Sequence, residues 1–82
     1  YEGVRMKIIK QVDWQAKGIE RVRWEIATVP DDMSIEDFIS QKIREGWEVI
    51  GITEDVIGKP ALFIEMDAKQ YNEGQNGGEI WS

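Results

Sequence analysis

Gly46 separates two different hydrophobic patterns, and this change of pattern constrains the fold more than any other feature of the sequence. In residues 34 to 45, apolar side chains recur every three or four positions, which predicts an amphipathic helix. In residues 47 to 53, WEVIGIT, Trp, Val and Ile predominate, which is typical of a strand. Glycine readily adopts the left-handed conformation that closes a helix. We therefore expect a helix that ends at Gly46 and leads directly into a strand.

The start of this helix has its own signals. Ser34 can cap the first turn, and Asp37 three residues later completes an approximate capping box. Met33 and Phe38 have the spacing of a hydrophobic staple. The residues predicted to share one apolar stripe are Ile35, Phe38, Ile39 and Ile43. The sequence thus predicts a single substantial helix, from Ser34 to Glu45.

Two strands are expected before the helix and two after it. Residues 4 to 12 and 19 to 29 alternate apolar and charged side chains, and the turn-forming segment 13 to 18 lies between them. Residues 47 to 53 and 61 to 66 form a second strand pair. We therefore predict an α+β fold of two antiparallel β-hairpins flanking one helix (β-β-α-β-β), with the helix on one face of a single sheet.

The charges on the first two strands suggest how they pair. Arg5, Lys7, Arg21 and Arg23 would stand opposite one another in a tight hairpin, which is unfavourable. A shifted register avoids this by placing Lys7 opposite Glu25 and Ile8 opposite Trp24. We expect the shifted register.

The second hairpin is apolar on both faces. Trp47, Val49 and Phe63 alternate along the strands with a second apolar set, formed by Ile50, Ile52, Leu62 and Ile64. One helix can cover only one face, so we expect a docked tail, a second copy or a partner to cover the other.

The segment KIREGWEVIGIT, residues 42 to 53, resembles a group of small bacterial and phage domains of unknown function. In those domains a helix ends in Glu-Gly-Trp, runs into a strand and is followed by a closing hairpin strand. The resemblance covers residues 22 to 66 and implies the fold, but it carries no activity, cofactor or catalytic residue. This chain differs in its longer first strand and its Gly-rich tail.

Composition limits the class of protein. With 82 residues, 41% hydrophobic and 32% charged, the chain fits one small globular domain. We expect that domain to span residues 1 to 71, followed by a flexible or docked tail over residues 72 to 82. Cysteine is absent and no apolar run is long enough to cross a bilayer, so we expect a cytoplasmic protein without membrane contact.

The residue types offer little catalytic chemistry. The sequence has no His and no Cys, which removes the commonest general base and the best nucleophile. Two acidic pairs, Asp31-Asp32 and Glu54-Asp55, fall where turns are expected, and neither has the spacing of a calcium loop. We expect no enzyme activity, no cofactor and no metal site.

Two binding functions remain open. The first is a protein-interaction or regulatory domain, with a protein partner or a second copy bound through an apolar sheet face and exposed Trp; its candidate residues are Trp14, Trp81, Ile80, Val49 and Phe63. The second is nucleic-acid binding by the basic face of the first hairpin, through Arg5, Lys7, Arg21 and Arg23. Residues 1 to 25 carry six Lys or Arg and four Asp or Glu, whereas the whole chain has a net charge of −6. This acidity makes nucleic acid the less favoured partner.

Overall fold

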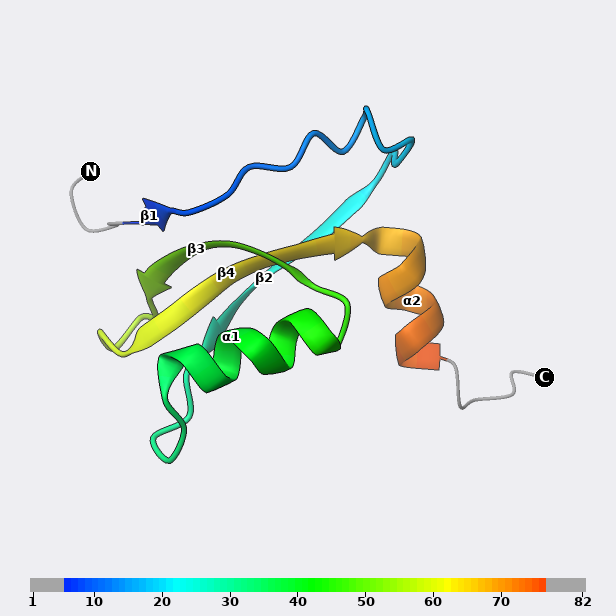
Figure 1. The fold of residues 1–82 in the computed structure, drawn as a ribbon. Coiled ribbons are helices and arrows are strands. Elements are labelled where there is room, and N and C mark those ends of the chain that lie inside the picture. Colours follow the sequence, from blue (N-terminus) through cyan, green and yellow to red (C-terminus); the bar gives the residue numbers. More distant parts are fainter. Residues whose placement is uncertain (1–5, 77–82) are drawn as a thin grey trace.

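The computed structural model describes residues 6–76, which form one antiparallel sheet with two helices (Figure 1). The elements are β1 (Lys7–Ile8), β2 (Val22–Thr28), α1 (Ile35–Arg44), β3 (Glu48–Glu54), β4 (Pro60–Asp67) and α2 (Ala68–Asn76). The sheet has four strands in the order β1-β3-β4-β2. The predicted α+β class is confirmed, while the chain order is β-β-α-β-β-α because a second helix follows β4.

The strand β4 lies between β2 and β3 and is antiparallel to both. β2 and β3 are therefore parallel to each other, and α1 connects them across β4. This is a split β-α-β arrangement. The hairpin of β3 and β4 was predicted from the sequence and is confirmed.

The predicted hairpin between the first two strands is wrong. Lys7 pairs with Ile52 rather than Glu25, and Ile8 pairs with Gly51 rather than Trp24. β2 instead pairs with β4 along its whole length, so β1 is left with the free edge of β3. Gly51 permits this approach, because a Cβ there would lie 2.7 Å from the carbonyl oxygen of Lys7.

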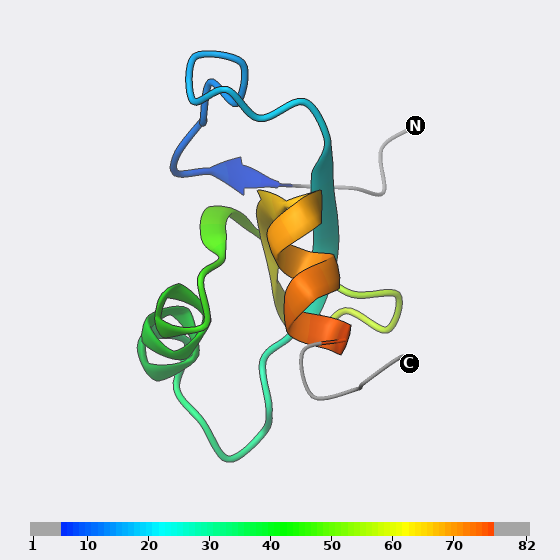
Figure 2. The same cartoon turned by 90° about the vertical axis from the view of Figure 1, so that its right-hand side faces the viewer.

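The chain between β1 and β2 has to cross the sheet, because the two strands occupy opposite edges. Figures 1 and 2 both place this connection above the sheet and α1 below it. The connection therefore lies on the face opposite α1. The β1–β2 connection therefore covers part of the sheet face opposite α1, for which the sequence predicted a tail, a second copy or a partner as cover.

Both predicted ends of α1 are confirmed. The Ser34 hydroxyl accepts a hydrogen bond from the Asp37 backbone N–H at 3.1 Å. At the other end, Gly46 has a φ of 99° and its N–H donates to the carbonyl of Ile43. Trp47 follows with its side chain buried, so the helix and β3 are joined at a fixed angle.

The core lies between α1 and the sheet, and Leu62 and Ile64 on β4 are fully buried. A β-bulge at Ile50 shifts the alternation of β3, so that Val49 and Ile52 share the core-facing side with Ile64 and Leu62. The remaining buried core residues are Val29, Phe38, Trp47 and Met66.

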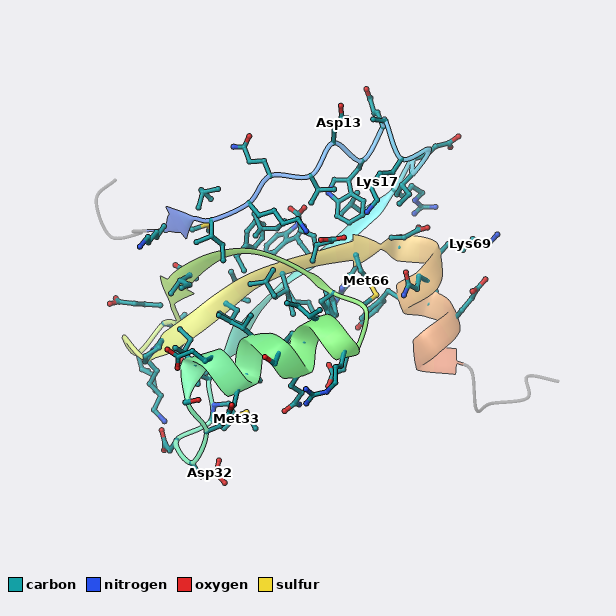
Figure 3. The ribbon with its side chains drawn as sticks, viewed as in Figure 1. Asp13, Lys17, Asp32, Met33, Met66 and Lys69 are labelled. Carbon is teal, nitrogen blue, oxygen red and sulfur yellow. The ribbon has the colours of Figure 1, made fainter. Side chains whose placement is uncertain are left out.

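The helix α2 is the element that the sequence analysis missed, since a single substantial helix and a tail from residue 72 were predicted. It begins directly after β4 and continues to Asn76, on the same side of the sheet as α1 (Figure 2). Its Tyr71 ring stands edge-on to Trp47 at 5.8 Å, and the guanidinium of Arg23 lies 4.6 Å from the centre of the same ring. In Figure 3, Lys69 marks the first turn of α2 and Met66 points from β4 towards the helices. These contacts, rather than an apolar periodicity, hold the helix.

Candidate protein-binding surface

An apolar row crosses all four strands on the face opposite α1. Ile8 pairs with Gly51, Gly51 with Phe63, and Phe63 with Ile26. Directly paired residues of antiparallel strands project from the same face, so these side chains lie side by side. Trp24 belongs to the same face, two positions before Ile26 on β2.

The side chains at the ends of this row are open to solvent. Trp24 is 59% exposed, Ile8 47% and Ile26 41%. The Trp24 ring stands edge-on to Phe63 with 5.7 Å between the ring centres, which holds the indole in one position. We refer to Ile8, Trp24, Ile26 and Phe63 as the Trp24 surface. A fixed but exposed Trp with apolar neighbours is typical of a binding surface.

The same part of β2 has a free backbone edge. Val29 donates its N–H to the carbonyl of Pro60, and Arg21 accepts at its carbonyl from the N–H of Ala68. In an antiparallel ladder, alternate residues bond to the same neighbour, so the odd-numbered residues of β2 bond to β4. The residues that direct N–H and C=O groups away from the sheet are Val22, Trp24, Ile26 and Thr28. Within residues 6–76 these groups meet no other strand.

Polar contacts attach the β1–β2 connection to the sheet beside the Trp24 surface. The Trp14 indole N–H donates to a carboxylate oxygen of Glu65 at 2.8 Å. Lys10 and Lys17 both form ion pairs with Glu48, the latter at 3.2 Å. The hydrogen bond from Lys10, followed by that from Lys17, holds the pKa of Glu48 below its ordinary value against the opposing effect of burial. Figure 3 shows Lys17 on the connection, above the sheet.

The structure brings together only some of the predicted protein-binding residues. Trp14 is half-buried against the domain's own sheet, and Phe63 is half-buried beneath Trp24. Val49 is buried in the core under α1, so it is not on an exposed face. Ile80 and Trp81 lie outside the described residues.

Trp24 itself was missed as a site residue. From the sequence it was placed opposite Ile8 in a hairpin of the first two strands, and it was not named among the candidate binding residues. One sequence signal could have identified Trp24 as a site residue. It is flanked by the charged residues Arg23 and Glu25, on a strand for which only one neighbouring strand was predicted.

The predicted basic face is divided by the sheet order. Lys7 lies on β1 at one edge, and Arg23 lies on β2 at the other. Arg23 pairs with Glu25 at 3.1 Å and stacks on Tyr71, so part of its charge is neutralised. Arg21 begins the same edge, and Arg5 lies outside the described residues. Within the described chain, Lys7 and Arg23 project from the same face of the sheet but lie at its opposite edges, so they do not form one patch.

A hollow lies on the α1 side of the sheet, between α1 and the chain that follows β1. Its volume is about 500 Å³. Exposed Ile9 and Ile43 form its two rims, and Val49 and Trp47 line it between them.

The described residues show no arrangement typical of a metal centre. Among them, no three His, Cys, Asp or Glu side chains are grouped so that they could hold a metal ion. Every buried side-chain nitrogen and oxygen in this part of the chain has a hydrogen-bond partner. No helix in residues 6–76 has the length and apolar character needed to span a membrane. The exposed apolar surface next to a free strand edge is therefore the main candidate site.

Comparison with known proteins adds no relative: no protein-family model matches the chain, and no curated protein or solved structure matches it.

Proposed function

We propose that this chain is a non-enzymatic protein-interaction domain that binds its partner through the Trp24 surface and the adjoining edge of β2. One observation carries the proposal: on β2, exposed apolar side chains and outward-facing backbone groups belong to the same residues, Trp24 and Ile26. A protein segment that adds to this edge gains main-chain hydrogen bonds and apolar burial together. Small ligands and nucleic acids gain less from such an edge.

The wider role follows from the sequence. Since the chain lacks His and Cys, a regulatory role is favoured over catalysis. The resemblance of residues 22 to 66 to small bacterial and phage domains supports a regulator that works in a bacterial cytoplasm. Nucleic acid is the less favoured partner, because Lys7 and Arg23, two of the predicted cations, lie at opposite edges of the sheet.

A comparison of three baits tests the function. The wild-type chain, the Trp24→Ser/Ile26→Ser variant and the Ile57→Ser control are used to capture proteins from host extract, and each captured protein is then purified and titrated against all three. Ile57 is exposed in the β3–β4 loop, away from the Trp24 surface. We expect a purified partner that binds the wild type and the control equally and binds the β2 variant at least tenfold more weakly. Equal binding to all three chains would refute the proposed surface.

A further inference from the structure

The charges of β2 are complementary to those of a second copy of β2 that runs antiparallel to it. Its sequence is VRWEIAT, in which Arg23 and Glu25 flank Trp24 symmetrically. When two copies of this strand run antiparallel with Trp24 opposite Trp24, each Arg23 faces the Glu25 of the other copy. Opposite charges in directly paired positions stabilise an antiparallel ladder.

Other self-pairings of β2 lack this match. With the symmetry axis at Arg23, the two Arg23 side chains face each other, and with the axis at Glu25 the two carboxylates do so. An axis at Val22 sets Arg21 against Arg23. An axis at Ile26 avoids like charges but pairs neither Arg23 nor Glu25 with an opposite charge. The axis at Trp24 is therefore the favoured register.

We propose that the partner of the Trp24 surface is a second copy of this chain, joined through its β2 edge about a two-fold axis at Trp24. The proposal rests on the proposed function, because it names the partner of the same surface. The backbone groups of Val22, Trp24 and Ile26 point outward, as this pairing requires. The two sheets then form one continuous sheet.

Both faces of the joined strands favour this arrangement. On the face opposite α1, Val22 of one copy lies beside Ile26 of the other, and the two Trp24 rings meet at the axis. On the α1 side, Arg23 and Glu25 already form an ion pair at 3.1 Å within one chain. Pairing joins two such ion pairs into a network of four side chains. The non-hydrogen-bonded position of Arg23 and Glu25 brings their side chains especially close across the ladder.

Charge exchange tests the pairing, with sedimentation equilibrium of the full chain at about 0.15 M salt, where the repulsion between two acidic chains is screened beyond ~8 Å. We expect the wild type to dimerise. Glu25→Arg and Arg23→Glu each place like charges opposite each other twice, so each variant alone should dimerise at least about tenfold more weakly. Mixed together, the two variants have opposite charges at every paired position, and we expect them to form a heterodimer. Charge-matched controls, Glu36→Arg and Lys69→Glu, should dimerise as the wild type does.

A strictly monomeric wild type at millimolar concentration would overturn the proposal. It would equally be overturned if Glu25→Arg and Arg23→Glu failed to associate when mixed, provided that each retained the wild-type circular dichroism spectrum. If dimerisation of Glu36→Arg and Lys69→Glu were weakened as much as that of the two β2 variants, the effect would be one of net charge rather than of this pairing, and the proposal would also be overturned.

The absence of cysteine makes a direct test of the register possible. A Cys at position 24 lies opposite its own copy, at a Cα separation of about 5.5 Å, which a disulfide spans. We expect Trp24→Cys to form a covalent dimer on oxidation. Ile26→Cys lies opposite Val22 of the other copy, far from its own counterpart, so it should stay uncrosslinked. Crosslinking of Ile26→Cys in preference to Trp24→Cys would overturn the two-fold axis at Trp24.

The two proposals can fail separately. If the chain is monomeric but a purified host protein still depends on Trp24 and Ile26, the inference of a second copy fails and the proposed function stands. If the chain dimerises as described but a host protein binds the Trp24→Ser/Ile26→Ser variant normally, the dimer stands, and the proposal that this surface binds a different host protein fails.

Discussion

Glu48 on β3 and Glu65 on β4 lie directly opposite each other, so two carboxylates share one position of the ladder. Such a pair is unfavourable unless other groups compensate for it. Here Lys10 and Lys17 bind Glu48, and the Trp14 N–H binds Glu65. All three compensating groups come from the β1–β2 connection. The carboxylate pair therefore fixes where this connection lies on the sheet.

The bond between Trp14 and Glu65 can be measured by a double-mutant cycle. Trp14→Phe keeps an aromatic ring but removes the N–H donor, and we expect a loss of about 1 kcal/mol in the free energy of unfolding. Urea denaturation of Trp14→Phe, of Glu65→Ala, which removes the acceptor, and of the double variant should give a coupling of at least about 0.5 kcal/mol. Strict additivity would mean that the hydrogen bond does not contribute.

Gly46 is expected to be intolerant of a branched side chain. Its φ of 99° is a conformation that Val adopts at a high cost, so Gly46→Val should destabilise the domain by at least about 1 kcal/mol. Gly74 is the matched control: it lies within α2 and a Cβ there would meet nothing within 4 Å, so Gly74→Ala should be neutral or stabilising. An unchanged denaturation midpoint for Gly46→Val would contradict the cap.

Gly51 should control the attachment of β1. A Cβ at this position would lie 2.7 Å from the Lys7 carbonyl oxygen and 3.2 Å from the Met6 side chain. Because backbone cannot move aside as a side chain does, Gly51→Ala should displace β1 and cost about 1–3 kcal/mol. The N–H groups of Ile9 and Lys10, which donate to the Ile50 carbonyl, should then lose protection from hydrogen exchange. Protection at the wild-type level would refute the close contact.

Asp55 should make the stability of the β3–β4 loop depend on pH. Its carboxylate accepts from the backbone N–H of Lys59 and of Ile57 and from the Thr28 hydroxyl, at 2.8 to 2.9 Å. The Lys59 N–H, followed by the Thr28 hydroxyl, lowers the pKa of Asp55 in the folded chain. A lowered folded pKa gives stability that is present above the unfolded value, about 3.9, and is lost as pH falls through the folded value.

The melting temperature from pH 2 to 7 measures this effect. We expect the wild type to be more stable than Asp55→Asn above about pH 5, with the difference disappearing towards pH 2. Thr28→Val, which removes one of the three donors, should reduce the pH-dependent part without abolishing it. A difference between wild type and Asp55→Asn that stays constant over the whole range would contradict the role of the charged form.

Nucleic-acid binding should be absent or independent of the predicted cations. Labelled DNA and RNA, single- and double-stranded, can be titrated at low salt with the wild type and the Arg21→Ala/Arg23→Ala variant. We expect no binding at micromolar protein, because Lys7 and Arg23 lie at opposite edges of the sheet. Binding that falls steeply with salt and is lost in the double variant would restore the nucleic-acid hypothesis.

The sequence allowed α1 and the hairpin of β3 and β4 to be predicted, because their signals are local. Ser34 and Gly46 mark the helix ends, and a short connection joins the two strands. The partner of β1 could not be predicted in this way. A period-two pattern identifies a strand but not its neighbour, and here Gly51 and the crossover through α1 decide the strand order.

The candidate site was predictable only in outline. An apolar sheet face and exposed Trp were expected, but the bulge at Ile50 turns Val49 into the core and leaves Phe63 on the opposite face. The exposure of Trp24 depends on the strand order, which the sequence did not reveal. α2 was missed because Tyr71 is held by Trp47 and Arg23, which are distant in sequence.

The short strand β1 has a consequence for solubility. Among residues 6–76 it pairs with β3 through Lys7 and Ile8, and it occupies the edge of the sheet opposite β2. Very short edge strands are a known protection against uncontrolled growth of sheets. A chain with one long open edge stops at a pair, whereas a chain with two can add copies without limit and form a filament. Detachment of β1 would expose the edge of β3 and would turn the proposed pair into the unit of a fibre.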